Sequence, residues 1–197
     1  SNGGRDIVAE LFKPLPSMVV AHYLGVPEEH RAQFDLWTDA IVAANTATGS
    51  LTQNLAGVGD AIGSMMAYFT ALIERRRHEP EDDTVSHLVA AGVGADGDIA
   101  GTLAILAFTF TMVTGGNDTT TGMLGGSVQL LHQRPDQRKL LVENPDLIPE
   151  SVDELLRLTS PVQGLARTTT RDVVVSDNLI PANRKVLLLY GSANHDP

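Results

Sequence analysis

Residues 115–120, Gly-Gly-Asn-Asp-Thr-Thr, form the segment whose composition most favours chemistry. A glycine inside a helix costs about 1 kcal/mol relative to alanine, but the missing Cβ lets a flat ligand lie against the backbone. Thr119 can donate a hydrogen bond to the carbonyl of Gly115, which loosens the helix and leaves room for a water. Asp118 adds a carboxylate. An acid, an alcohol and a loosened backbone together predict a proton-delivery site.

The same residues also suit a purely structural interpretation. Gly115 and Gly116 would let a second helix approach closely, and Asp118 would be satisfied by a neighbouring side chain. The residues alone favour neither interpretation over the other.

A second candidate is the pair Glu154 and Arg157, three residues apart on an expected helix, where the two side chains face the same way. The same spacing occurs at 28–31 and 74–77, and an exposed pair of this kind contributes only about 0.2–1 kcal/mol. The pair at 154–157 is a stronger candidate than the other two because of its position in the chain. It follows the glycine-rich segment and precedes Arg167.

Several classes of site are excluded by composition. The sequence contains no cysteine, which excludes disulfides, thiolate metal sites and cysteine nucleophiles within these residues. Its six histidines show no metal-ligand spacing, and no phosphate-binding loop or dinucleotide fingerprint occurs. The sequence therefore predicts no metal site within the chain.

Charge and length narrow the class of protein. The 197 residues carry 14 Lys and Arg against 24 Asp and Glu, a net charge of −10, which argues against nucleic acid as a partner. The length predicts a single domain over residues 1–197. The first four residues show no targeting signal, so a cytoplasmic protein is expected.

The expected fold is mainly α, with helices over residues 6–159 and a small β region over 166–191. The expected helices cover residues 6–24 with a break at Pro14 and Pro16, 28–44, 55–77, 84–91, 99–131, 135–142 and 149–159. Residues 45–53 are expected to be a loop. Runs 172–176 and 185–190 predict strands, and Asp177-Asn178 predicts a turn.

Two of these helices have clear inward faces. Helical spacing places Phe34, Trp37 and Ile41 on one face of residues 28–44. The same spacing predicts that the inward residues of the next helix are Met65, Phe69 and Leu72.

The helix expected over 99–131 has only one charged residue, Asp118. A membrane span is one interpretation, but the clean apolar run ends at Val113 and a charge in mid-bilayer is costly. A central helix surrounded by protein on all sides is the favoured structural interpretation. No membrane association is expected.

The order of these motifs resembles the cytochrome P-450 family of haem-thiolate monooxygenases, in their bacterial soluble form. The likeness covers nearly the whole chain, and the fold it implies is the family's helical fold, incomplete. It is carried by residues 14–27, 115–120, 154–157, 160–167, 180–182 and 186–197.

The resemblance implies a role for each candidate residue. Asp118 would relay protons, and Thr119 would hold water or dioxygen beside the iron. Gly115 and Gly116 would border the haem, and Arg167 would pair with a haem propionate. Glu154 and Arg157 would form a structural ion pair. The positions implied to contact the substrate are Thr111, Thr114, Val162 and Leu165.

The resemblance also implies which partners the complete enzyme would have and which part of the enzyme this chain would lack. The complete enzyme would oxidise a hydrophobic small molecule and take electrons from a ferredoxin-type or flavoprotein-type donor. The likeness ends before the loop that carries the family's cysteine ligand, so the chain is expected to be a central fragment, inactive by itself and without thiolate-ligated haem. The alternative is a haem-free helical binding module or scaffold derived from the same family.

Overall fold

A computed structural model describes residues 3–46 and 51–196. The chain divides into two compact units, Ser1–Thr121 and Gly122–Pro197. The single domain expected over residues 1–197 stays a prediction. Of the loop expected over 45–53, residues 47–50 lie outside the described residues.

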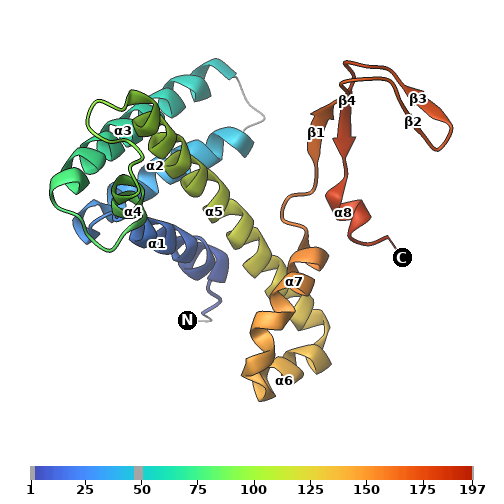
Figure 1. Ribbon diagram of the computed structural model, residues 1–197. Coiled ribbons are helices and arrows are strands. Elements are labelled where there is room, and N and C mark those ends of the chain that lie inside the picture. The colour runs from blue at the N-terminus through green and yellow to red at the C-terminus, as the bar shows by residue number, and fades with distance from the viewer. Residues whose placement is uncertain (1–2, 47–50, 197) are drawn as a thin grey trace. The chain divides into compact units, whose positions relative to one another are not determined.

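In the described part of the first unit, every regular element is a helix or a helical turn, and loops join them. A π-helical turn at Val8–Phe12 precedes α1, and a 3-10 turn at Glu28–His30 precedes α2 (Figure 1). Its helices are α1 (Pro14–Tyr23), α2 (Arg31–Thr46), α3 (Leu51–His78), α4 (Thr84–Ala90) and the first part of α5 (Ile99–Gln133). Proline fits a first helical turn because the amide hydrogen it lacks would be unpaired there. Pro14 and Pro16 accordingly start α1, which confirms the predicted break.

The core of this unit follows the helical periodicity of the sequence. Phe34, Trp37 and Ile41 are buried on α2, and Met65, Phe69 and Leu72 are buried on α3. Both predicted inward faces are therefore confirmed. Apolar side chains of α1, α4 and α5 complete the same cluster.

One buried cation ties three segments of this unit together. Arg76 on α3 is 2% exposed, and its Nε lies 2.7 Å from Oδ2 of Asp83, which is also buried. Its Nη1 contacts Oε1 of Glu81 at 2.5 Å, and Nη2 donates to the carbonyl of Gly25, after α1, at 3.4 Å. Asp83 also caps α4 by accepting from the backbone N–H of Ser86 at 2.7 Å.

Gly25 is the point where this cluster leaves no room for a side chain. It has φ +76°, and a Cβ there would lie 2.2 Å from Oδ2 of Asp83. We expect Gly25→Ala to lower the free energy of unfolding by about 2–4 kcal/mol, because left-handed strain and overpacking add. In urea unfolding, the matched control is Gly63→Ala in α3, where a Cβ meets nothing within 4 Å. That change should stabilise by about 0.5–1 kcal/mol, and equal effects at the two sites would contradict the prediction.

Helix α5 has one buried face and one exposed stripe within the first unit. Ile105, Thr109 and Val113 are almost fully buried, whereas Leu103 and Phe108 are exposed. The expectation of a helix surrounded on all sides is therefore wrong for these residues. Length and composition alone would let α5 cross a membrane, but its buried face belongs to the core of the first unit.

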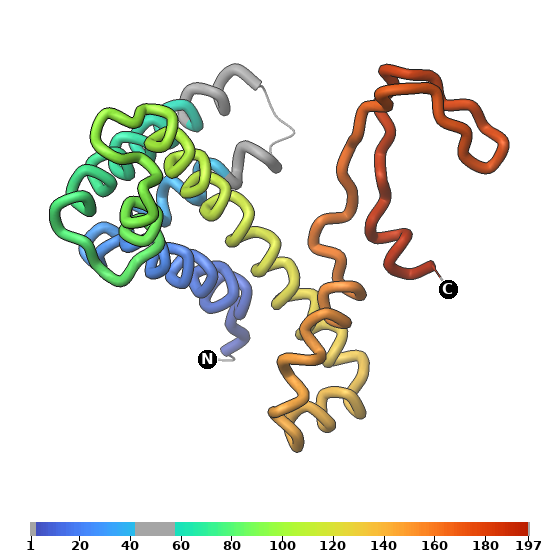
Figure 2. The backbone as a smooth tube through the Cα atoms, in the orientation of Figure 1, coloured from blue at the N-terminus to red at the C-terminus, as the bar shows by residue number. Residues whose placement is uncertain are grey.

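The second unit combines three helices with two small antiparallel ladders. It contains the end of α5, α6 (Pro135–Glu143), a 3-10 turn at Pro145–Leu147, α7 (Ile148–Thr159) and α8 (Tyr190–Ala193). Its strands are β1 (Leu165–Thr168), β2 (Val173–Val175), β3 (Asn178–Ile180) and β4 (Lys185–Leu188). β1 pairs with β4, and β2 pairs with β3 in a hairpin at the tip of the unit (Figure 2).

The predicted strands contain β2 and β4, but two details differ from prediction. Tyr190 starts α8 instead of ending a strand. The hairpin turn lies at Ser176 and Asp177, with φ 46° and 65°, one residue earlier than predicted. A two-residue turn with positive φ at both positions matches the twist of the paired strands, which fixes it between β2 and β3.

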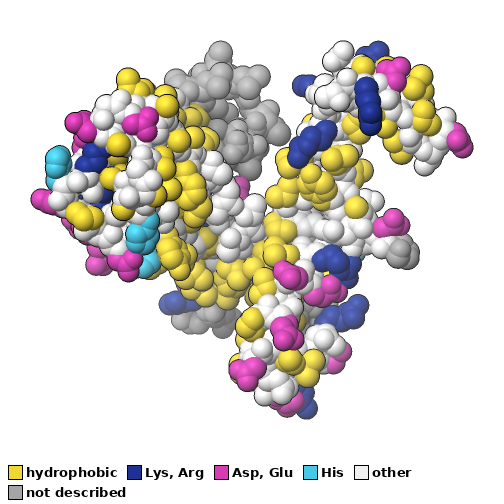
Figure 3. Space-filling model, viewed as in Figure 1, with side chains coloured by type: hydrophobic (Ala, Val, Ile, Leu, Met, Phe, Trp, Pro, Cys, Tyr) yellow, Lys and Arg dark blue, Asp and Glu magenta, His cyan; other side chains and the backbone are white. Residues whose placement is uncertain are grey.

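The surface of the second unit changes along its length. The α6–α7 end carries interspersed basic and acidic side chains, whereas hydrophobic side chains gather over the β1–β4 ladder (Figure 3). Leu165, Leu187 and Leu188 are the large apolar residues exposed on that ladder.

Candidate functional site

The exposed stripe of α5 carries most of the residues singled out in the first unit. Thr111, Gly115 and Asp118 follow one another at spacings of four and three residues, and all three are exposed. Thr119 lies beside them, and its Oγ1 donates to the carbonyl of Gly115 at 2.6 Å. The predicted hydrogen bond is therefore confirmed, although α5 continues as a helix through it.

The two adjacent glycines have different surroundings. A Cβ on Gly115 would meet nothing within 4 Å, whereas a Cβ on Gly116 would lie 2.9 Å from Cγ2 of Val20 on α1. Close helix packing, one of the two interpretations of this motif, therefore applies at Gly116. Gly115 leaves an open surface against which a flat group can lie.

The threonines nearby are tied to their own helix. Oγ1 of Thr111 donates to the carbonyl of Ala107 at 2.8 Å, and Oγ1 of Thr114 donates to that of Phe110 at 3.0 Å. Thr111 is exposed and Thr114 is half-buried, and their contact with a substrate stays a prediction.

Asp118 is a carboxylate without a local partner. It forms no hydrogen bond or ion pair to another residue in the part of the chain that the structure describes. It also lies in the wall of a cavity of about 250 Å³ between α1, α2 and α5. Asp118 thus borders this cavity and directly precedes Thr119 in the helix, and a proton-delivery role for the two residues stays a prediction.

The predicted ion pair of the second unit is formed. Nε and Nη2 of Arg157 each lie 2.7 Å from a carboxylate oxygen of Glu154, in the two-pronged geometry that suits guanidinium. Nη1 of Arg157 donates to the carbonyl of Asn194, so the pair joins α7 to the segment after α8. The hydrogen bonds from Arg157 hold the pKa of Glu154 below its ordinary value.

This lowered pKa predicts the sign of a pH effect. Wild type should be more stable than Glu154→Gln at neutral pH, because the folded state favours the charged carboxylate. The difference should shrink as pH falls below about 4.3, the ordinary glutamate value, and vanish below the lowered folded pKa. Urea unfolding of both proteins from pH 7 to pH 3 measures this. Asp153→Asn, an exposed change on the same helix, is the matched control for the substitution itself. A difference between wild type and Glu154→Gln that does not depend on pH would contradict the assignment.

The remaining candidates lie on the loop after α7 and on β1. Val162, Leu165 and Arg167 are all exposed, and Arg167 is paired across the ladder with Val186. The guanidinium of Arg167 donates only to the adjacent Ala166 carbonyl, at 3.0 Å, among the described residues. Charged donors therefore remain available to an anionic group. These residues belong to the second unit, whereas the acid and the alcohol of α5 belong to the first.

Sequence reasoning missed two polar residues of the structure. Asn117 is 5% exposed, donates from Nδ2 to the carbonyl of Val113 at 2.8 Å, and has an unpaired Oδ1. Ser160 is buried at φ 40° and accepts from Nδ2 of Asn194 at 2.9 Å. Asn117 could have been found from its four-residue spacing to the buried Val113. No local signal identifies Ser160.

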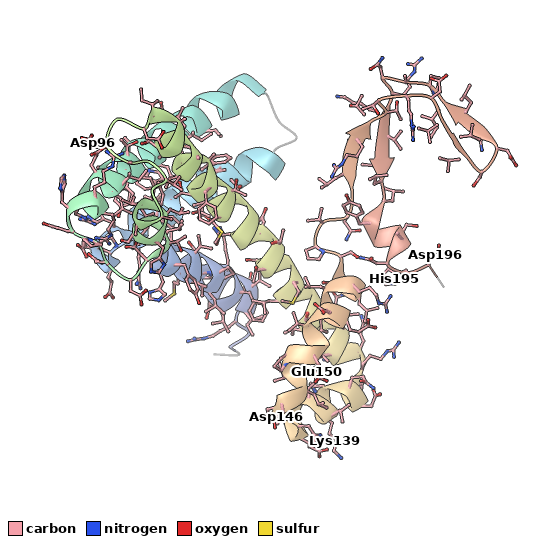
Figure 4. All side chains as sticks on the ribbon, viewed as in Figure 1. Asp96, Lys139, Asp146, Glu150, His195 and Asp196 are labelled. Atoms are coloured by element: carbon pink, nitrogen blue, oxygen red, sulfur yellow. The ribbon has the colours of Figure 1, made fainter. Side chains whose placement is uncertain are left out.

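The C-terminal histidine remains without a role. His195 and Asp196 follow α8 near the end of the chain (Figure 4), and both are exposed. Among the described residues, His195 forms no hydrogen bond or ion pair with another candidate residue.

Comparison with known proteins gives a consistent result. The family model described as Cytochrome P450 matches residues 48–197. A Mycobacterium tuberculosis protein named Cytochrome P450 130 is 76% identical over 196 residues, which is 100% of this chain and 47% of that protein. Vitamin D(3) 25-hydroxylase from Pseudonocardia autotrophica is 36% identical and is covered to the same extents.

Comparison with solved structures points to the same family. CYP109E1 from Bacillus megaterium, in complex with corticosterone, matches with a TM-score of 0.87 and 33% identity, covering 98% of this chain and 51% of that one. The chain thus spans about half the length of the relatives it matches.

Proposed function

Because the chain belongs to the cytochrome P450 family, we propose that it is part of a haem-dependent monooxygenase acting on a hydrophobic small molecule. The single observation that carries this proposal is the exposed stripe of α5. There Thr119 is bonded to the Gly115 carbonyl, and Asp118 stands beside it with access to a cavity. The mainly helical fold with a small β part matches that of the family's solved structures.

The residues present fit parts of a haem site. Gly115 offers an open surface for a flat macrocycle, and the guanidinium of Arg167 is available to a propionate. The sequence contains no cysteine, so these residues do not supply the thiolate that ligates the iron. When bound with that ligand, haem supplies dioxygen binding and O–O cleavage.

The residues of this chain then have distinct tasks. Thr119 holds a water or dioxygen by its hydroxyl, and Asp118 delivers protons to that position. Each turnover inserts one oxygen atom into a C–H bond and reduces the other to water, using two electrons and two protons. Glu154 and Arg157 do no chemistry; they hold α7 against the segment after α8.

The substrate is a hydrophobic molecule in this proposal. Thr111, Thr114, Val162 and Leu165 would contact it, and Gly116 would sit behind the haem surface on the helix. The corticosterone bound by one structural relative and the vitamin D(3) in the name of another favour a large apolar ring system. The electron donor would be a ferredoxin-type or flavoprotein-type partner, and the protein would act in the cytoplasm.

The decisive experiment follows the oxygen atoms. The haem-loaded enzyme that contains this segment is supplied with an electron donor, corticosterone or vitamin D(3), and isotopically labelled dioxygen. One labelled atom should appear in the hydroxylated product and the other in water, as detected by mass spectrometry. Label in neither the product nor water, despite bound substrate, would overturn the monooxygenase assignment.

The isolated chain provides a second test. We expect it to be inactive and to lack the absorption spectrum of thiolate-ligated haem when haem is added. The haem-free module is the competing interpretation; it would bind apolar ligands tightly in this same isolated form and would unfold cooperatively. Cooperative unfolding together with saturable ligand binding would favour the module.

A further inference from the structure

The polar cavity in the first unit carries more negative than positive charge. It has a volume of about 250 Å³ and lies between α1, α2 and α5. Among the described residues, the charged side chains in its wall are Lys13, Asp35, Asp39 and Asp118. Nζ of Lys13 lies 2.9 Å from Oδ1 of Asp39, so these two charges balance each other. The carboxylates of Asp35 and Asp118 have no cationic partner in the described part of the chain.

Asn117 adds a buried acceptor that lacks a donor. The side chain is 5% exposed, and its Nδ2 donates to the Val113 carbonyl at 2.8 Å. A carbonyl can only accept, so this bond fixes which end of the amide is the oxygen. Oδ1 is buried without a partner among the described residues. Because buried acceptors nearly always receive a hydrogen bond, this oxygen indicates a donor that the described residues do not supply.

The hydroxyl groups of the wall have already used their hydrogens. Oγ of Ser17 donates to Oδ1 of Asp35. The Oγ1 atoms of Thr38 and Thr121 donate to backbone carbonyls, each at 3.0 Å. A hydroxyl has one hydrogen and two lone pairs, so these groups can only accept from a molecule in the cavity. The wall therefore presents hydroxyl, amide and carboxylate oxygens that all act as acceptors.

Such a wall complements a guest that is positively charged and donates hydrogen bonds. A primary ammonium group has three N–H donors and no acceptor, and its hydrogen bonds to carboxylates are stronger than those from a neutral donor. A water molecule would leave the negative charge uncompensated. A divalent metal ion suits the wall less well, because no group of three or more histidine or acidic side chains converges as a metal site in the described part of the chain.

We propose that this cavity binds the ammonium group of a small alkylamine, with Asp35, Asn117 and Asp118 as its acceptors. The guest enters from solvent, because Asp35 is exposed, and the cavity has room for a molecule the size of several waters. Ala9 and Pro14, which also lie in the wall, offer apolar contact to a short alkyl chain. The site goes beyond the proposed function and does not depend on it, since binding requires neither dioxygen nor an electron donor.

Isothermal titration calorimetry of the haem-loaded enzyme with n-propylammonium chloride tests this site. We expect saturable binding at a single site. Tetramethylammonium has the charge but no N–H donor, and n-propanol has a similar shape but no charge, so each should bind at least about tenfold more weakly. Equal binding of the three compounds, or no saturable binding of propylammonium, would overturn the proposal. Displacement by an equal concentration of potassium chloride would assign the site to a metal ion and would overturn it as well.

Two substitutions should change the affinity in opposite directions. Asp35→Asn removes an uncompensated charge and should weaken propylammonium binding about tenfold. Lys13→Met frees the carboxylate of Asp39 and should tighten binding about threefold, a gain that misfolding cannot produce. The matched control is Asp60→Asn, which removes an exposed acid of α3 outside the cavity wall and should leave the affinity unchanged. Wild-type affinity in both Asp35→Asn and Lys13→Met would contradict the assignment.

A crystal structure with propylammonium gives an independent readout. Its nitrogen should lie within hydrogen-bond distance of Oδ1 of Asn117. Binding of the neutral amine to the haem iron is a different event: it would change the haem absorption spectrum and would not respond to Asp35→Asn, and such a result would count against the cavity site. If the enzyme bound the amine here but transferred no oxygen, the proposed function would fail and this site would stand.

Discussion

Asp118→Asn should lower the turnover number of the haem-loaded enzyme by about 100-fold or more, while the KM for substrate changes little. The amide has the same shape as the carboxylate but cannot take up and release protons at neutral pH. Asp118 is exposed and has no bonding partner in the described chain, so the change should not disturb the fold. Steady-state kinetics with product detection measures both constants.

The matched control for this variant is Asp96→Asn. Asp96 is an exposed acid of the same unit, in the loop before α5 (Figure 4), and its replacement should leave both constants unchanged. If Asp118→Asn instead raised KM and kept the turnover number, the carboxylate would be a substrate contact and not a proton donor.

The largest effect on stability is expected at Arg76. Arg76→Met should lower the free energy of unfolding by about 3–5 kcal/mol, because it leaves the Asp83 carboxylate buried beside an apolar group. The same change removes the bond to the Gly25 carbonyl and the contact with Glu81. Urea unfolding followed by circular dichroism measures the loss.

The neighbouring arginine supplies the control for Arg76. Arg75 is exposed on the same helix, and Arg75→Met should change stability by no more than about 0.5 kcal/mol. A loss below about 1 kcal/mol at Arg76 would mean that water reaches Asp83 once the arginine is gone, and that the burial of this pair is not what holds the segments together.

The sequence predicted the helices of the first unit well, for a physical reason. A helix that buries one face must repeat its apolar residues every three or four positions, so Phe34, Trp37 and Met65 could be placed inward in advance. This reasoning failed on α5. Its residues are apolar nearly all round, and periodicity then carries no information about which face packs inward. Which face of α5 is exposed depends on the helices that pack against it. The local sequence pattern does not identify those helices.

Some features of the candidate site could likewise be predicted from the sequence, and others could not. The bond from Thr119 to Gly115 and the pair at 154–157 depend on helical spacing alone, so the sequence predicted both. The unpaired Oδ1 of Asn117 and the left-handed backbone of Ser160 depend on contacts with distant segments. The hairpin turn was placed one residue late because Ser176, not Asn178, adopts a positive φ.

The two adjacent glycines of α5 are subject to different evolutionary constraints. At Gly116 the constraint is internal, because Val20 occupies the space that a side chain would need. Any descendant that kept this helix pairing would have to keep position 116 small, whatever its function. At Gly115 a Cβ would meet nothing within 4 Å, so the described residues place no such constraint on position 115. If the proposed haem lies against this glycine, the cofactor is the constraint there, and a lineage that gave it up would be free to vary position 115 while position 116 stayed small.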